Sequence, residues 1–273
     1  MLRRLLGGLS RKAARHHCSK PFRMLNREPL VSFTFDDVPD SAYLNGARIL
    51  DEAGFHGTFY IASGICGTSD THWQVIDNSQ VRALHDGGHE IGCHTFSHVA
   101  VETLDAPNMA EETERNRERL MALCPGIRLT NFCYPFGKVS LPRKLQLQKS
   151  FDTCRGIYEG INAGKIDLAL LRVIELYDRT LTEEKLERVL RETRERNGWL
   201  IFYTHDVADP PSWIGCSPAK FKSTVQAVQD LGMRCVTIRA ALSEIGFEGS
   251  AERSIASQPA VQGSRHAMQP RVG

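Results

Sequence analysis

The chain has 273 residues, of which 41% are hydrophobic and 24% charged, and its formal net charge is +2. A chain of this length can bury roughly three quarters of its unfolded surface, so we expect one large domain or two small ones. The small net charge and the interleaving of basic with acidic residues argue against a nucleic-acid partner. No run of about twenty apolar residues occurs, so no transmembrane segment is expected.

Residues 1–29 are predicted to form a basic N-terminal arm. Residues 1–15 contain no acid and lack the apolar stretch of a signal peptide. The simplest interpretation is a poorly ordered cationic arm, and the alternatives are a transit peptide or a basic helix in weak contact with a membrane surface. The eight cysteines are scattered without a C-x-x-C pair, which favours reduced thiols. We therefore expect a cytoplasmic protein.

Strand-like and helix-like segments alternate between residues 30 and 247. Predicted strands are 31–35, 57–61, 129–134, 151–157, 170–176, 199–204 and 234–238, with 89–93 leading to a histidine pair, and predicted helices are 41–53, 79–86, 109–123, 182–197 and 219–231. About seven alternations without a linker indicate one parallel α/β domain that forms a closed or nearly closed barrel. Residues 248–273 are rich in Ser, Gln, Gly, Pro and Arg, and we predict a disordered tail there.

Polar and turn-forming residues follow several predicted strands directly. These groups are Asp36-Asp37, His94 with His98, Tyr134-Pro135-Phe136, and His205. In parallel barrels the carboxyl ends of all strands lie at one face, where catalytic residues gather. Taken singly, each group has an ordinary explanation, such as a turn, a helix cap or a solvated helix face. Their joint placement favours one shared site.

The residue types in these groups match a hydrolytic metal site. Two imidazoles at i, i+4 spacing, His94 and His98, and one carboxylate make a three-ligand zinc site with a position left for water. One aspartate of the Asp36-Asp37 pair can hold the metal, while the other is free to take a proton from the attacking water. His205 is suited to protonate a departing nitrogen. This combination predicts hydrolysis of an amide.

Four segments together resemble the ordered motifs of the polysaccharide deacetylases, the NodB-homology enzymes of carbohydrate esterase family 4. They are Thr34-Phe35-Asp36-Asp37, the run from Gly88 to His98, the run from Phe132 to Gly137, and Tyr203-Thr204-His205-Asp206. The resemblance covers roughly residues 30 to 240. It implies a distorted (β/α) barrel related to the TIM barrel. It also implies removal of an acetyl group from an N-acetylated sugar with the help of Zn²⁺ or another divalent transition metal such as Co²⁺.

The resemblance also implies roles for individual residues. Asp36 matches the general base, His205 the general acid, and Asp37, His94 and His98 the metal ligands. In the Pro135-Phe136 turn, the backbone N–H of Phe136 matches a donor that helps to hold the oxyanion.

The chain departs from the family pattern at Cys133, where many members carry an arginine that orients the catalytic aspartate. Arg155, in the predicted strand 151–157, is the first candidate to supply this guanidinium, and Arg172 is the second. Cys93 stands where relatives often have asparagine, and we interpret it as a packing residue.

Three functions remain open from the sequence. The leading one is a zinc-dependent N-deacetylase acting on an acetamido sugar, in a glycan or on a nucleotide- or lipid-linked precursor. The others are a related hydrolase of a non-sugar amide, and a sugar-binding protein with impaired catalysis. Trp213, just beyond His205, is a candidate for stacking on a sugar ring.

Overall fold

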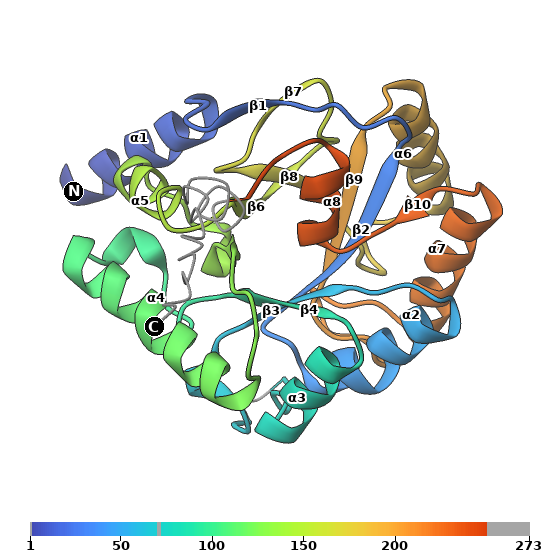
Figure 1. Cartoon of the computed structure of the whole chain (residues 1–273), viewed down its shortest axis with the longest axis horizontal. Helices are drawn as coiled ribbons and strands as arrows, with labels where there is room; N and C mark the ends of the chain where they lie inside the picture. Colours follow the sequence, from blue (N-terminus) through green and yellow to red (C-terminus); the bar gives the residue numbers. More distant parts are fainter. Residues whose placement is uncertain (1, 70–71, 250–273) are drawn as a thin grey trace, which may run out of the picture.

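The computed structural model describes residues 2–69 and 72–249, and in it seven parallel strands close into a barrel with helices around it (Figure 1). The barrel strands are, in order around the barrel, β2 (Leu30–Asp36), β3 (Thr58–Ile61), β4 (Glu90–Cys93), β5 (Asn131–Cys133), β6 (Thr153–Glu159), β8 (Leu171–Glu175) and β9 (Trp199–Thr204). The barrel closes because β9 pairs with β2 over six residues, from Leu30 opposite Trp199 to Phe35 opposite Thr204. The predicted barrel is confirmed.

The barrel is uneven, as the predicted fold class requires. β4 and β5 share a single residue pair, Cys93 with Phe132, whereas the register between β6 and β8 shifts along their length. The start of β2 also pairs with a short outer strand, β10 (Arg234–Cys235), before its end pairs with β3. The strands therefore enclose a distorted rather than a regular cylinder.

Alternation along β2 determines what lies inside the barrel. Ser32, Thr34 and Asp36 alternate with Phe33 and Phe35, and all five side chains are buried. The two phenylalanines join an aromatic cluster beneath the helices, where the Phe35 ring stacks on Phe59 of β3 at 4.4 Å between centroids. The polar residues form hydrogen bonds within the barrel, so this strand places Asp36 at the polar end of an otherwise buried element.

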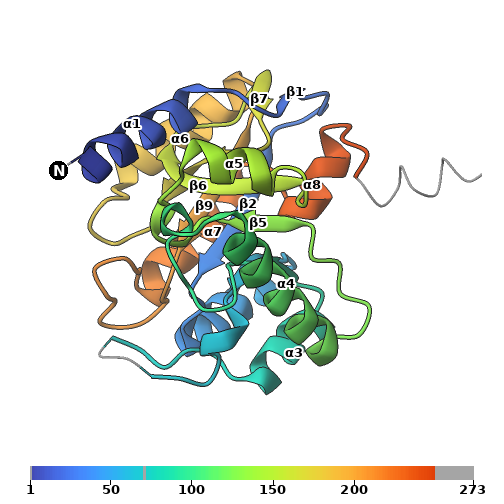
Figure 2. The same cartoon turned by 90° about the vertical axis from the view of Figure 1, so that its left-hand side faces the viewer.

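Helices cover the outside of the strands (Figure 2). They are α2 (Arg48–Glu52), which continues a π-helical turn at Ala42–Ala47, then α3 (Asn78–Asp86), α4 (Ala106–Leu123), α5 (Leu141–Leu147), α6 (Glu183–Glu195), α7 (Pro218–Asp230) and α8 (Ile238–Glu244). Side chains cap several of them; for example, Asp77 and Gln80 form a reciprocal capping box at α3. Within the described ranges, no helix is both long and apolar enough to cross a membrane.

The N-terminal arm packs against the barrel instead of being poorly ordered. It forms a helix, α1 (Leu2–His16), and a short strand, β1 (Pro21–Arg23), which pairs antiparallel with β7 (Lys165–Asp167). Lys144 of α5 is fully buried, and its Nζ donates hydrogen bonds to the carbonyls of Ala14 and His17. The same ammonium lies 2.6 Å from a carboxylate oxygen of Asp167. These contacts fix the end of α1 beside α5 (Figure 1).

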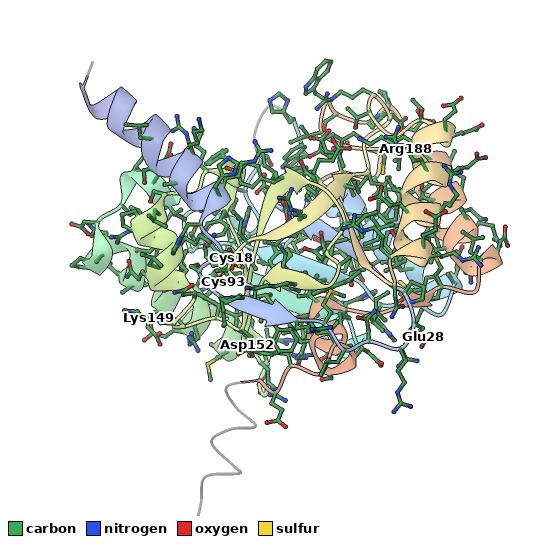
Figure 3. The ribbon with its side chains drawn as sticks, turned by 90° about the horizontal axis from the view of Figure 1, so that it is seen from above. Cys18, Glu28, Cys93, Lys149, Asp152 and Arg188 are labelled. Atoms are coloured by element: carbon green, nitrogen blue, oxygen red, sulfur yellow. The ribbon has the colours of Figure 1, made fainter. Side chains whose placement is uncertain are left out.

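The predicted strand 234–238 is a strand only at β10, because Thr237 caps the start of α8 by accepting from the N–H of Ala240. The predicted tail, 248–273, lies outside the described residues from residue 250 onward, and the proposed domain boundaries stay a prediction. All eight cysteines are free thiols, with Cys18 exposed and Cys93 buried (Figure 3).

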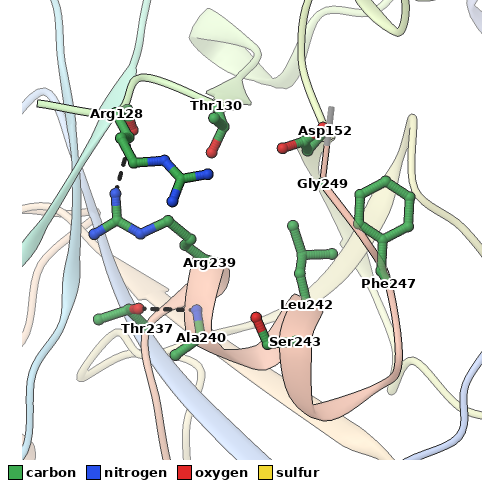
Figure 4. A pocket seen from close by; sticks show the side chains of 10 residues that line it. All are labelled: Arg128, Thr130, Asp152, Thr237, Arg239, Ala240, Leu242, Ser243, Phe247 and Gly249. Carbon is green, nitrogen blue, oxygen red and sulfur yellow. Dashed lines mark hydrogen bonds between the residues drawn. The ribbon is translucent and has the colours of Figure 1, made fainter. Parts of the chain in front are cut away.

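Helix α8 closes the amino-terminal end of the barrel. Glu90, buried at the start of β4, accepts hydrogen bonds from the hydroxyl of Thr58 and the N–H of Arg239. Beside α8, a pocket of about 260 Å³ is lined by Arg128, Thr130, Asp152, Thr237, Arg239, Ala240, Leu242, Ser243, Phe247 and Gly249 (Figure 4). Three of the residues that line it, Arg128, Thr130 and Asp152, come shortly before strands β5 and β6 begin. The pocket therefore lies at the amino-terminal end of the barrel, opposite the predicted site residues.

Candidate active site

The sequence-predicted site residues lie together at the carboxyl end of the barrel. Asp36 is the last residue of β2, Asp37 follows it, His94 follows β4, and His205 follows β9. His98 lies four residues beyond His94 in the connecting loop. The other four side chains lie at or directly after the end of a buried strand, which leaves little freedom in their placement.

Three of these side chains converge on one carboxylate. Oδ1 of Asp37 lies 3.2 Å from Nε2 of His94 and 2.7 Å from Nε2 of His98. Nε2 of His205 lies 3.9 Å from the other oxygen, Oδ2. Asp37, His94 and His98 thus each offer a ligand atom, and these atoms lie within 4.8 Å of one another.

The chemistry of this triad fits a divalent transition metal. One carboxylate oxygen and two imidazole nitrogens are the donor set of hydrolytic zinc sites. Oδ1 of Asp37 is buried and makes no hydrogen bond of ordinary geometry, although two imidazoles stand close to it. A buried anionic oxygen without a regular hydrogen bond is stabilised by a cation at that point. The residues present therefore fit a metal ion.

A second set of candidate ligands, Asp36, His94 and Cys133, shares one histidine with the first. Burial raises the pKa of the Cys133 thiol, which disfavours the thiolate that a metal requires. The carboxylate of Asp36 is already paired with the guanidinium of Arg155. The triad of Asp37, His94 and His98 is therefore the better metal site.

Hydrogen bonds to the backbone orient two of the histidines. Nδ1 of His94 lies 2.8 Å from the carbonyl oxygen of Cys133, and Nδ1 of His205 lies 3.1 Å from that of Ile214. A carbonyl only accepts, so in each ring Nδ1 carries a proton and Nε2 is directed toward Asp37. This arrangement gives His94 the tautomer that a metal ligand needs.

The two adjacent aspartates are kept ionised by different partners. Burial by itself raises the pKa of Asp36, but the Arg155 guanidinium outweighs it and brings the pKa below its usual value. Burial likewise raises the pKa of Asp37, but the adjacent imidazoles of His94 and His98 outweigh it and bring the pKa well below the usual range. Burial would lower the pKa of His94, yet the Cys133 sulfur and Asp37 raise it well above normal. The carboxylates thus favour positive charge at this point.

Arg155, and not Arg172, reaches Asp36. Nη2 of Arg155 contacts Oδ1 of Asp36 and lies 2.9 Å from the sulfur of Cys133, while Nη1 donates to the carbonyl of Gly156. Arg172 is exposed and donates instead to the carbonyl of Glu159. The residue that stands in place of the missing arginine, Cys133, is small enough for the guanidinium of the neighbouring strand to pass.

Tyrosines sandwich this buried guanidinium. The Cζ of Arg155 lies 4.9 Å from the ring centroid of Tyr60 and 5.2 Å from that of Tyr203. Stacking on aromatic faces stabilises a cation that is otherwise costly to bury. The sequence analysis included Tyr203 in the motif that contains His205 without giving it a role, and it did not single out Tyr60, which lies inside a strand without a motif of its own.

Backbone strain is concentrated at the site. Among the described residues, six residues other than glycine have positive φ, and five of them are Asp37, Val38, Thr95, His98 and Phe136. Such conformations cost on the order of 1–3 kcal/mol each and persist only where surrounding contacts enforce them. Here they turn the chain sharply at the ends of β2, β4 and β5, directly at the predicted functional residues.

Glu112 of α4 supports the loop that carries the histidine pair. Its Oε2 accepts from the backbone N–H groups of Phe96, at 3.0 Å, and of Ser97, at 2.8 Å, and its Oε1 accepts from the Ser97 hydroxyl. One helical turn further, Asn116 is buried and bonds to the end of β3 at Ile61 and Ser63. No sequence signal pointed to Glu112, which resembles any other acid of a charged helix.

Aromatic side chains border the site. The ring of Phe136 is 56% exposed and lies 4.4 Å from the ring of His98. On the other side, Trp73 stacks near His205 at 6.2 Å between centroids, and Tyr177 lies 6.0 Å from the same histidine. Among the described residues, the backbone N–H of Phe136 has no hydrogen-bond acceptor, so it remains able to donate to a ligand.

Comparison with known proteins agrees with this geometry. The family model described as "Polysaccharide deacetylase" matches residues 25–152. A search of curated proteins finds no match to the chain.

Solved structures share the fold at low sequence identity. A family 4 acetyl xylan esterase from Clostridium thermocellum, in complex with a cobalt ion, has a TM-score of 0.57 at 20% identity over 80% of this chain and 93% of that one. A family 4 carbohydrate esterase from Bacillus subtilis has a TM-score of 0.56 at 13% identity, over 89% of this chain and 90% of that one. A peptidoglycan N-acetylglucosamine deacetylase has a TM-score of 0.58 at 16% identity, over 84% of this chain and 93% of that one.

The chain combines a distorted parallel barrel with carboxylates and imidazoles gathered at the carboxyl ends of its strands. Residues 25–152 are thus similar to the polysaccharide deacetylase family, and the fold is similar to that of family 4 carbohydrate esterases.

Proposed function

We propose that the protein is a metal-dependent N-deacetylase that hydrolyses the acetamide of an N-acetylated sugar to acetate and a free amine. The observation that carries the proposal is the convergence of Asp37, His94 and His98 beside a separately held carboxylate, Asp36. A hydrolase of amides needs a base, an acid and an oxyanion site, and the chain offers one candidate for each.

Asp36 is the proposed general base. Its carboxylate takes a proton from the water that attacks the acetamide carbonyl carbon. The ion pair with Arg155 keeps it ionised in a buried position and fixes its orientation. The guanidinium also lowers its basicity, so we attribute the benefit of the pair to placement and ionisation rather than to proton affinity.

His205 is the proposed general acid. As the tetrahedral intermediate collapses, the C–N bond breaks and Nε2–H of His205 gives its proton to the departing nitrogen. The bond from Nδ1 to the carbonyl of Ile214 keeps the ring oriented while this proton moves. An amine leaves poorly without a proton, so an amide substrate needs this group most.

The backbone N–H of Phe136 is the proposed donor to the oxyanion. Phe136 has a left-handed φ of 58° in the tight turn after β5, and its ring lies next to the ring of His98. A preorganised N–H aimed at a developing negative charge contributes about 2.7–4 kcal/mol to transition-state binding in well-studied cases.

Asp37, His94 and His98 would hold the metal, for which zinc or cobalt is proposed. When bound, such an ion supplies Lewis acidity that polarises a carbonyl and lowers the pKa of water to about 7. The protein's part is to provide three ligands oriented by strand ends and by the hydrogen bond of His94 to Cys133.

Acetate release tests the proposal directly. Purified protein loaded with zinc or cobalt is incubated with N-acetylglucosamine, its oligomers and its nucleotide-linked form, and with a panel of simple non-sugar amides. We expect acetate from at least one sugar and none from the simple amides. Asp36→Asn should abolish release. Hydrolysis of the simple amides without any sugar turnover would contradict the proposed substrate class.

A further inference from the structure

Two aromatic–cation pairs flank the candidate active site on loops that follow barrel strands. Arg179 and Tyr177 lie after β8, and the guanidinium of Arg179 stacks 4.5 Å from the ring centroid of Trp213, in the loop after β9. Lys138 lies after β5, with its Nζ 5.5 Å from the ring centroid of Phe136. One pair therefore stands on the His205 side of Asp37, and the other on the His98 side.

The position of Arg179 is fixed while its hydrogen-bonding edge remains free. Its Nε donates to the carbonyl of Trp213 at 2.8 Å, and its Cζ lies 5.4 Å from the ring centroid of Tyr177. The ring of Tyr177 is in turn 6.0 Å from that of His205. In the described part of the chain, neither terminal nitrogen of Arg179 has a hydrogen-bond partner.

Nearby carboxylates do not neutralise this guanidinium. Asp178 accepts from the N–H and hydroxyl of Ser217 at the start of α7, and Asp206 is buried and accepts from Ser212. Within the described residues, neither Arg179 nor Lys138 forms an ion pair. Arg196, by contrast, pairs with Glu192.

A planar guanidinium with a free edge, connected to the proposed acid His205 through the ring of Tyr177, is suited to bind a carboxylate or phosphate. The exposed ring of Trp213 beside it offers an apolar surface for a sugar face. We propose that the substrate is an anionic acetamido sugar, carrying a carboxylate or phosphate that Arg179 binds, with Lys138 adding positive charge. This specificity rests on the proposed deacetylase function, because it places the acetamide at the metal triad.

Three probes separate neutral from anionic sugars and distinguish the two sources of charge. They are N-acetylglucosamine, N-acetylmuramic acid with its carboxylate, and N-acetylglucosamine 6-phosphate. Binding is measured by calorimetry with the Asp36→Asn variant, and acetate release with the native chain. We expect an anionic sugar to bind at least about tenfold more tightly than the neutral one, and added salt to reduce the difference.

Matched variants attribute the preference to Arg179. Arg179→Gln removes the charge and should abolish the preference, while Arg179→Lys should restore part of it. Arg172→Gln removes the same charge from an exposed site away from the triad and should leave the preference for an anionic sugar unchanged. Circular dichroism and melting temperature check that each variant folds.

The outcomes for the two proposals differ. Equal binding of all three sugars, or a preference that survives in Arg179→Gln, would overturn the proposal of an anionic substrate bound by Arg179. Release of acetate from the neutral sugar would in that case still support the deacetylase function. Binding that favours an anionic sugar without acetate from any probe would uphold recognition by Arg179 and count against the proposed reaction.

Discussion

Arg155 and Asp36 lie 119 positions apart in sequence, on strands β6 and β2 that face each other across the barrel, and their side chains meet inside it. Arg155 is fully buried, and its guanidinium also contacts the sulfur of Cys133. Cys133 thus stands where the resemblance led us to expect an arginine, and the positive charge comes from the next strand. We therefore expect Arg155 to contribute both to the stability of the protein and to the placement of the proposed base, Asp36.

Replacing Arg155 by alanine should destabilise the protein and reduce turnover. The change leaves the Asp36 carboxylate buried without its partner, which costs about 3–5 kcal/mol of unfolding free energy. We also expect kcat to fall while bound metal is retained, because the ligand triad is untouched. Urea denaturation, metal analysis and acetate assays measure the three effects. Unchanged turnover would contradict a role for Arg155 in placing the base.

The double variant Arg155→Ala with Asp36→Asn provides the control for stability. Removing the second charge eliminates the unpaired carboxylate, so part of the lost unfolding free energy should return. If the double variant is as unstable as the sum of the two single variants, the pair contributes no coupling and the cost arises from lost packing alone.

Replacing His205 by alanine should impair amide hydrolysis far more than ester hydrolysis. Loss of a general acid typically costs about 10²–10⁴-fold in rate when the leaving group needs a proton. A nitrophenyl acetate has a leaving group that needs none, so its hydrolysis should fall much less. Parallel kcat/KM measurements on both substrates test the assignment. An equal loss on both substrates would indicate a structural role for this histidine.

Replacing Glu112 by alanine should weaken metal binding. The carboxylate accepts three hydrogen bonds from the loop that carries His94 and His98, and loss of such support typically lowers metal affinity about 10–100-fold. Glu111, adjacent on α4, makes only a 3.7 Å surface ion pair with Arg115, so Glu111→Ala is the matched control. Competition with a chromogenic chelator gives the metal dissociation constant of each variant. Identical constants for Glu112→Ala and Glu111→Ala would refute the supporting role of Glu112.

Replacing Lys144 by methionine should release the N-terminal helix from the barrel. The ammonium holds the end of α1 through two carbonyls and pairs with Asp167, and the variant removes these three interactions. We expect faster proteolytic cleavage near residues 14–20 and faster hydrogen exchange in α1. Lys149→Met, at an exposed position, should change neither. If Lys144→Met protects α1 from cleavage and hydrogen exchange as well as the native chain does, other contacts are sufficient to hold this helix on the barrel.

The strands and the site were predictable because each carries a strong local signal. Buried β-strands ending on Asp36, Cys93 and Thr204 stand out as apolar runs followed by charged or imidazole side chains. Parallel pairing then requires those ends to share one face. The gathering of the predicted residues at one end of the barrel therefore follows from pattern and topology, without knowledge of side-chain geometry.

What could not be predicted depends on contacts between distant segments. Helix α1 has leucines at 2, 5, 6 and 9, a helical spacing, but its packing depends on contacts with distant segments, such as the hydrogen bonds of the buried Lys144 and the pairing of β1 with β7. Helix α8 begins where a strand was predicted to end, because Glu90 and Thr58 accept its first N–H groups. The support by Glu112 likewise arises only from the folded chain.

Metal stoichiometry tests the central claim most directly. Dialysis of the native chain and of Asp37→Ala and His98→Ala against zinc or cobalt, followed by elemental analysis, measures the bound ion per chain. The account predicts one tightly bound ion in the native protein, its loss in both variants, and acetate release that disappears on chelation and returns with the metal. A native chain that retains no divalent ion, or variants that bind it equally well, would contradict the account.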